Sequence, residues 1–325
     1  MTREDSMKLL DAFYEAGGNA IDTANNYQDM ESEQIIGDWM ETKGNRDEMV
    51  IASKYTSPLP RKTAQIKANM FGNGQKPLTV SLASSLKNLK TTYLDILYVH
   101  WWDNATSIPE MMHALDIVVK QGKVLYLGIS DTPAWIVSAA NMYARDHALT
   151  PFVIYQGKWS ARTRDMERDI IPMCRAEGMA IAPWNALGGG AFKTKAQLEQ
   201  MEKAGDKGRS SKPDKHDQNM TDVLEKIGKS IGSSHTAVAL AWIMAKEPYV
   251  FPIIGGRKLE HLKDNIEALK IRLTKQQMEE IENVVEFDLG FPNTFHGMKA
   301  GENFWKTTSH QYEFPREETS ISAPQ

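Results

Sequence analysis

Four chemically active side chains lie at or just beyond the ends of three short apolar segments of the chain. They are Asp22 and Tyr27 in NAIDTANNYQ, Lys54 in MVIASKY and His100 in LDILYVHW. Each segment is typical of a buried β-strand, and helical patterns lie between the segments. Strands that alternate with helices form parallel sheets, in which the C-terminal strand ends share one edge. We therefore expect an acid, a phenol, an amine and an imidazole to meet in one proton-transfer site.

Asp22 and Lys54 both end largely apolar strand segments, where an unpaired charge is costly to bury. Adjacent strand ends would let the two charges form a buried ion pair. This pair either only neutralises the two charges or also takes part in catalysis. Tyr27 favours catalysis, because a nearby ammonium stabilises phenolate and turns a phenol of pKa about 10 into a usable acid. His100, which Trp101 follows, is either a hydrogen-bonded core residue or, beside the other three, a group that orients a carbonyl oxygen.

The whole chain of 325 residues alternates between strand and helix patterns without a change in composition that would separate domains. This alternation predicts one (β/α)8 TIM barrel domain over residues 1–325, with a core from about 5 to 285. Strand patterns occur at 19–24, 48–55, 94–101, 123–130, 152–160, 179–186 and 249–256.

A closed barrel needs eight strands, and the chain begins on what should be the first helix, so we expect the first strand to be missing. A truncated gene product, a wrongly placed start codon and an open barrel are the three explanations of this count. An open barrel would expose two strand edges and should be less stable.

Two segments depart from the repeating pattern. Residues 193–221 are charged and nearly free of large apolar side chains, which predicts a polar loop insertion that is either simply solvated or a flexible lid over a ligand. Residues 287–325 form a C-terminal tail with several aromatic side chains and no helical period. The tail is expected either to pack along the barrel wall or to fold over its mouth and line a substrate pocket.

Composition is that of an ordinary globular protein, with 41% hydrophobic and 25% charged residues and a net charge of −4. The absence of a basic field gives nucleic-acid binding little support. Neither a signal peptide nor an apolar run long enough for a membrane span is evident. The eight histidines show no ligand-like spacing, so no metal is expected. We expect a cytoplasmic enzyme with a small-molecule substrate, and the sequence does not indicate its oligomeric state.

The stretch GGNAIDTANNYQ resembles the aldo-keto reductase signature around the catalytic acid and tyrosine, and Lys54 and His100 match the rest of that family's tetrad. The resemblance extends from residue 5 to about 285. The segments IDTANNYQ, SEQIIGDWM and FDLGFPNTF are similar to the fungal aryl-alcohol dehydrogenase and norsolorinic acid reductase branch. The resemblance implies an oxidoreductase that transfers hydride between NADP(H) and an aldehyde or ketone, with Tyr27 as general acid or base. Tyr27, His100 and Trp101 are expected to contact the substrate, and an aryl or polyketide-like substrate is expected.

The resemblance also implies where the cofactor binds. The nicotinamide end would contact Asp22, Ser130, Asp131 and Gln156, and Trp184 would stack on its face. Asp131 stands where the family usually has asparagine, so its side chain accepts hydrogen bonds but does not donate them. The adenine end would contact residues of PIIGGRKLEHLKDNIEAL, namely Gly255, Gly256, Arg257, Asp264 and Asn265. Arg257 is expected to bind the 2′-phosphate, which favours NADPH over NADH.

Two alternatives to an active reductase follow from the same features. One is a regulatory protein that holds the cofactor without significant turnover, and the other is an inactive truncated paralogue. The intact tetrad argues against both, and the expected loss of the first strand argues for reduced activity. Turnover of an aromatic aldehyde with NADPH separates the enzyme from both alternatives.

Overall fold

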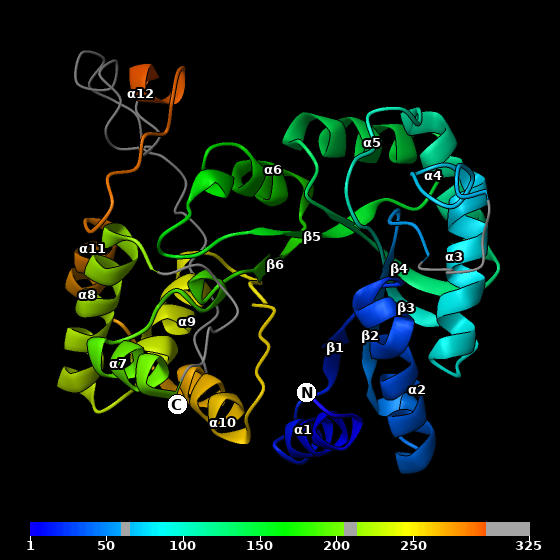
Figure 1. Ribbon diagram of the computed structural model, residues 1–325. Helices are drawn as coiled ribbons and strands as arrows, with labels where there is room; N and C mark the ends of the chain where they lie inside the picture. The colour runs from blue at the N-terminus through cyan, green and yellow to red at the C-terminus, as the bar shows by residue number, and fades with distance from the viewer. Residues whose placement is uncertain (60–65, 205–212, 297–325) are drawn as a thin grey trace. The chain divides into compact units, whose positions relative to one another are not determined.

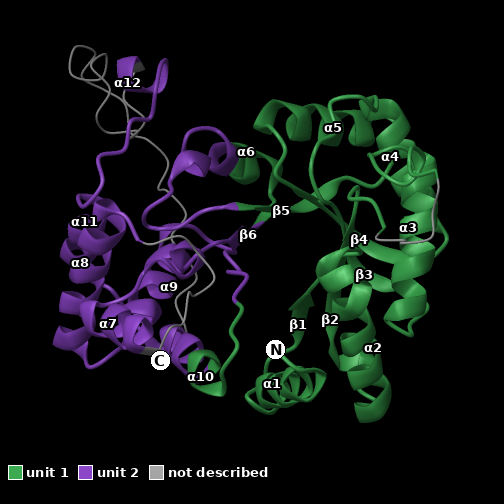
Figure 2. Cartoon of the chain, in the orientation of Figure 1, with its two compact units in different colours: residues 1–157, 173–180, 255–262 green, residues 158–172, 181–254, 263–325 purple. Residues whose placement is uncertain are grey.

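The structure is a computed structural model that describes residues 1–59, 66–204 and 213–296 (Figure 1). Its residues cluster into two compact units (Figure 2). Unit 1 comprises residues 1–157, 173–180 and 255–262, and unit 2 comprises the rest. Each unit is described by itself below, and the single barrel domain expected over residues 1–325 stays a prediction.

A parallel sheet forms the centre of unit 1. Its first five strands are β1 (Ala20–Asp22), β2 (Val50–Tyr55), β3 (Leu94–Val99), β4 (Val124–Ser130) and β5 (Phe152–Lys158). They follow chain order in the sheet, and each pairs in parallel with the next. The register pairs Asp22 with Ala52, Lys54 with Tyr98, and Ser130 with Gln156. The C-terminal strand ends therefore share one edge, as the alternation of the sequence predicts.

Helices separate these strands along the chain. They are α1 (Arg3–Glu15), α2 (Glu31–Lys43), α3 (Gln75–Asn88), α4 (Ile108–Lys120) and α5 (Ala134–Asp146). Figure 1 shows α2, α3 and α4 along the outer side of the strands. Thr2 and Ser107 cap α1 and α4, because each side chain accepts a hydrogen bond from an amide of the first turn. A sheet covered in this way buries apolar side chains such as Ile51, Leu97 and Ile129.

The remaining elements complete both units. They are α6 (Ile170–Glu177), β6 (Ala180–Trp184), α7 (Lys195–Ala204), α8 (Lys215–Ile231), α9 (His235–Lys246), α10 (Leu259–Glu267), α11 (Lys275–Glu282) and α12 (Asn293–His296). The core of unit 2 includes Trp159 and Trp242, whose rings meet edge to face at 6.1 Å between centroids. No helix within the described ranges has both the length and the apolar character that crossing a membrane requires.

The prediction of a strand at 249–256 is wrong, because this segment forms only an isolated parallel bridge between Ile181 and Val250. Backbone hydrogen bonds still run from Phe251 N to Ile181 O at 2.8 Å and from Ile253 N to Pro183 O at 2.8 Å. Pro183 has no N–H to donate, so the ladder between the two segments is interrupted.

The prediction of a loop over 193–221 is wrong where α7 and the start of α8 lie. Asp214 and Asp217 form a reciprocal capping box at the start of α8. The helix α7 was missed because KAQLEQMEKA offers only Leu198 and Met201 as large apolar residues. Residues 205–212 of this loop, part of the possible lid, and residues 297–325 of the aromatic tail lie outside the described residues.

Candidate active site

Asp22 and Lys54 form the ion pair that the sequence suggests. The Lys54 ammonium donates to the Asp22 carboxylate and to the Thr23 carbonyl oxygen, the latter at 2.8 Å. The Lys54 side chain is 0% exposed and that of Asp22 is 11% exposed. Because both charges are nearly desolvated, their pairing and the added hydrogen bond offset a large burial cost. The parallel pairing of β1 with β2 brings them together.

Tyr27 lies just beyond β1, in the short 3-10 helix Tyr27–Met30. The Lys54 nitrogen is 5.2 Å from the centroid of the Tyr27 ring, and the His100 ring lies 5.9 Å away in an edge-on arrangement. Gln28, Asp29 and Met30 then adopt φ values of 46°, 55° and 76°. Three consecutive left-handed residues without glycine are strained, and such strain is concentrated at functional sites. The chain thus brings all four predicted tetrad residues together.

His100 follows β3 and is half-buried. Burial lowers the pKa of its imidazole to about 4, and the positive charge of Lys54 lowers it further in the same direction. His100 is therefore neutral at pH 7, with one ring nitrogen that donates and one that accepts. Its backbone N–H donates to Thr56 Oγ1 at 3.3 Å.

Tyr98 is a second phenol beside Lys54, which sequence reasoning missed. The Lys54 nitrogen lies 5.7 Å from the centroid of the Tyr98 ring. Burial raises the pKa of the Tyr98 phenol, and the Asp22 charge raises it further. Tyr98 is 2% exposed, whereas Tyr27 is half-buried, so Tyr27 is the phenol that a substrate can reach.

Several residues assigned to the nicotinamide end lie beside the tetrad. The Gln156 side-chain amide donates to Asp22 Oδ1 at 2.9 Å. Ser130 is buried and pairs with Gln156 in the sheet. The backbone N–H of Asp131 donates to the Gln156 carbonyl at 3.1 Å, and Asp131 has a φ of 43°. Asparagine and aspartate tolerate this left-handed conformation better than most residues do, which suits the substitution at this position.

The other predicted cofactor residues belong to separate parts of the structure. Gly255, Gly256 and Arg257 lie in the 255–262 segment of unit 1, and Arg257 is exposed. Neither glycine has a positive φ, and a Cβ on Gly255 would meet no atom within 4 Å. Trp184 is half-buried in unit 2, where Lys158 Nζ lies 5.9 Å from its ring centroid. On α10, Asp264 is exposed and Asn265 is buried, and both belong to unit 2.

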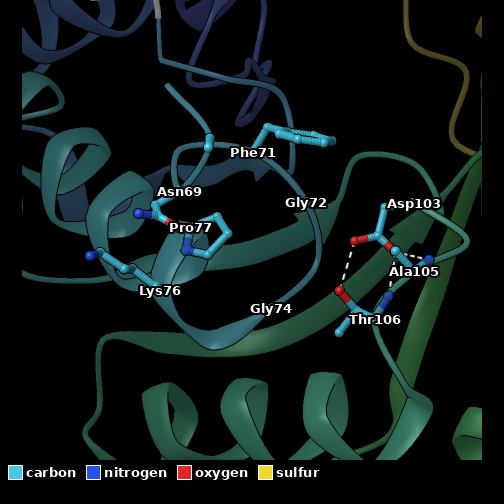
Figure 3. Close-up of a pocket in the computed structure, with 10 residues that line it drawn as sticks. Asn69, Phe71, Gly72, Gly74, Lys76, Pro77, Asp103, Ala105 and Thr106 are labelled. Atoms are coloured by element: carbon cyan, nitrogen blue, oxygen red, sulfur yellow. Dashed lines mark hydrogen bonds between the residues drawn. The ribbon is translucent and has the colours of Figure 1, made fainter. Parts of the chain in front are cut away.

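A pocket of about 280 Å³ lies between the loops that follow β2 and β3 (Figure 3). Asp103 lines this pocket and accepts hydrogen bonds from Thr106 Oγ1 at 2.7 Å and from the Asn73 N–H at 2.8 Å. Burial raises the pKa of Asp103, but hydrogen bonds from Thr106, Asn73 and Ala105 outweigh it and hold this pKa below its usual value.

Phe71 lines the pocket and lies at 6.5 Å and 27° to the Trp101 ring. Sequence reasoning predicted Trp101 as a substrate contact and missed Phe71. Phe71 stands in the glycine-containing loop segment MFGNG, which has no periodicity to reveal its partner.

Comparison with known proteins identifies the family to which the chain belongs. Residues 1–286 match the model of the Aldo/keto reductase family. Norsolorinic acid reductase B of Dothistroma septosporum is 52% identical over 295 residues, covering 90% of this chain and 75% of that protein. The NADP(+) aryl-alcohol dehydrogenase of Phanerodontia chrysosporium is 49% identical over 335 residues, covering 98% of this chain and 86% of that protein. The chain therefore belongs to the aldo/keto reductase family, as the resemblance of its sequence predicts.

Proposed function

We propose that this chain reduces an aryl aldehyde or ketone to its alcohol with hydride from NADPH, or catalyses the reverse reaction, in a (β/α)8 barrel. Its family membership makes it an NADP-dependent oxidoreductase. The observation that carries the assignment of residues is the cluster of Tyr27, Lys54 and His100 around the Asp22 ion pair. The parallel strands of unit 1 and the helices between them support the barrel.

The proposed proton donor is Tyr27. Its hydroxyl gives a proton to the substrate oxygen as that oxygen gains negative charge, and the Lys54 ammonium stabilises the resulting phenolate. Asp22 holds Lys54 in place and is itself held by Gln156. A neutral His100 donates a hydrogen bond to the same substrate oxygen, so two donors stabilise the developing alkoxide.

The residues beside Asp22 fit a nicotinamide. Ser130, Asp131 and Gln156 lie next to each other along the backbone at the sheet edge, and hydroxyl, carboxylate and amide side chains match the donors and acceptors of a carboxamide. Bound NADPH would supply the hydride. Arg257, Gly255 and Gly256 are proposed for the 2′-phosphate and adenine end, together with Asp264 and Asn265, and Trp184 for the nicotinamide face.

The aryl substrate class is supported by Phe71, which lines the pocket and whose ring lies nearly parallel to that of Trp101. Flat aromatic groups favour offset stacking on such rings. Two relatives bear the names aryl-alcohol dehydrogenase and norsolorinic acid reductase, which agrees with this class.

The experiment that tests this function combines binding and turnover. Quenching of the fluorescence of the eight tryptophans measures NADPH affinity, with NADH as the control. NADPH oxidation is then followed with benzaldehyde derivatives and with acetaldehyde. We expect tighter binding of NADPH than of NADH and faster turnover of the aryl aldehydes. Binding of NADPH by the folded chain without turnover of any aldehyde would favour the non-catalytic regulatory alternative.

A further inference from the structure

The Ser57 hydroxyl lies between two side chains of the loop that follows β3. Its Oγ accepts a hydrogen bond from Trp101 Nε1 at 3.2 Å and lies 3.5 Å from Nδ1 of His100. An indole N–H only donates, so the direction of the Trp101 bond is fixed. The hydroxyl therefore still has its own proton to donate, and His100 Nδ1 is the acceptor that the described contacts offer it.

The backbone holds Ser57 firmly in this position. Its carbonyl oxygen accepts from Asn25 Nδ2 at 2.9 Å, and the same amide group of the fully buried Asn25 donates to Ser81 Oγ at 2.8 Å. The preceding residue, Thr56, has a φ of 90°, which is strained for a β-branched side chain. Thr56 Oγ1 also accepts from the His100 backbone N–H at 3.3 Å, which ties the two loops together. Strain that is held by surrounding hydrogen bonds is typical of functional positions.

We propose that Ser57 is a positioning residue that keeps His100 in the tautomer with its proton on Nε2. The proposal rests on the role of His100 in the proposed function. A neutral imidazole carries one N–H, so a proton on Nδ1 would leave Nε2 able only to accept. When Ser57 donates to Nδ1, that nitrogen must be unprotonated, and Nε2–H is then available to the substrate carbonyl oxygen.

The surroundings of His100 make the tautomer matter. Burial and the charge of Lys54 lower the pKa of His100, so its imidazole is neutral at pH 7 and has a single N–H. Only one of the two ring nitrogens can then donate a hydrogen bond. The hydroxyl therefore raises the share of the imidazole that has its proton on Nε2 and can donate to the substrate oxygen. Outer hydrogen bonds that fix the tautomer of a functional histidine are a general device in proteins.

The tautomer is tested directly by NMR of the full-length chain labelled with ¹⁵N in histidine. The His100 signals are assigned by their loss in His100→Asn. The proposal predicts an unprotonated Nδ1 and a protonated Nε2 in the wild type, and a loss of this preference in Ser57→Ala. A protonated Nδ1 in the wild type, or an unchanged tautomer in Ser57→Ala, would overturn it.

Kinetics of three variants test the consequence. Ser57→Ala removes the hydroxyl, with its contacts to both His100 and Trp101, and keeps the backbone bond to Asn25. We expect kcat to fall about tenfold from the lost bond to His100, with NADPH affinity unchanged. Ser57→Thr retains a hydroxyl and should recover kcat to within about threefold. Ser84→Ala removes another half-buried hydroxyl, which donates to Met30 Sδ at 4.0 Å, and is the matched control.

Equal kcat values for Ser57→Ala and Ser84→Ala would contradict the proposal. Failure of the proposed function is distinguishable, because it would appear as an absence of aldehyde turnover in the wild type. The NMR measurement needs no turnover and tests the tautomer in either case.

Discussion

Gln156, on β5, donates a 2.9 Å hydrogen bond from its side chain to the Asp22 carboxylate at the end of β1. Three strands lie between β1 and β5 in the sheet order. A direct bond between these two strands is possible only when the sheet of unit 1 curls strongly, so this contact links the curvature of the fold to the candidate site. It also gives the Asp22 carboxylate a partner besides Lys54.

Removing this contact should weaken both the fold and the site. Gln156→Leu leaves the Asp22 carboxylate without one of its donors, and a hydrogen bond to a charged group contributes about 1.5–3 kcal/mol. We expect the free energy of unfolding in urea to fall by about 2 kcal/mol and NADPH to bind more weakly. An unfolding free energy equal to that of the wild type would show that the bond does not hold Asp22.

The buried ion pair predicts a non-additive pair of substitutions. Lys54→Met leaves the Asp22 charge buried without its cationic partner, and breaking such a pair costs about 3–5 kcal/mol of stability. Adding Asp22→Asn removes the stranded charge and should restore a large part of that loss, but turnover should stay absent in both variants. Urea denaturation and aldehyde reduction measure the two effects. Additive losses of stability would mean that the two residues do not act as a pair.

The low pKa of His100 predicts how stability depends on pH. The folded pKa of about 4 lies below the ordinary value of 6.5, so between these values the unfolded chain binds the extra proton. Stability should therefore be complete above pH 6.5 and fall as the pH drops toward 4, by up to about 3 kcal/mol from this group.

Burial also lowers the pKa of His235, so stability depends on pH through both histidines. The test therefore compares the wild type with a variant that lacks only His100. The free energy of unfolding is measured against pH for the wild type and for His100→Asn. The gap between the two curves should change across pH 4 to 6.5 and stay constant above it. A gap that is constant over the whole range would contradict the buried neutral imidazole.

The pocket predicts a substitution that acts on substrate preference. Phe71→Ala removes one of the two near-parallel rings, so KM for aryl aldehydes should rise about threefold to tenfold while KM for acetaldehyde changes little. Tyr126→Ala is the control, because Tyr126 is 57% exposed but lies in the first half of β4, away from the C-terminal strand ends. Equal effects of Phe71→Ala on both aldehyde classes would exclude the aryl contact.

Periodicity and strand-end chemistry predicted the main features of the site. The apolar segments that end at Asp22, Lys54 and His100 are short enough to be strands, and parallel pairing then brings their ends together. The same reasoning could not reveal Ser57, Phe71 or the Gln156 bond to Asp22. These contacts depend on how two irregular loops approach each other and on how far the sheet curls, neither of which leaves a periodic pattern.

The wrong predictions have local physical reasons. Residues 249–256 are apolar like a strand, but Pro183 of the facing segment has no N–H to donate, and the two segments form only an isolated bridge between Ile181 and Val250. The helix α7 carries so few apolar side chains that its sequence is typical of a loop, although its polar residues are good helix formers. Composition alone does not separate a polar helix from a polar loop.

The central claim, that Tyr27 is the proton donor, is tested most directly by comparing Tyr27→Phe with Tyr98→Phe. The two rings lie 5.2 Å and 5.7 Å from the Lys54 nitrogen, so each variant removes a phenol beside the same charge. The account predicts that Tyr27→Phe lowers kcat for an aryl aldehyde by at least about 100-fold with NADPH affinity unchanged, whereas Tyr98→Phe keeps kcat within about tenfold. Wild-type turnover in Tyr27→Phe, or a larger loss in Tyr98→Phe, would contradict it.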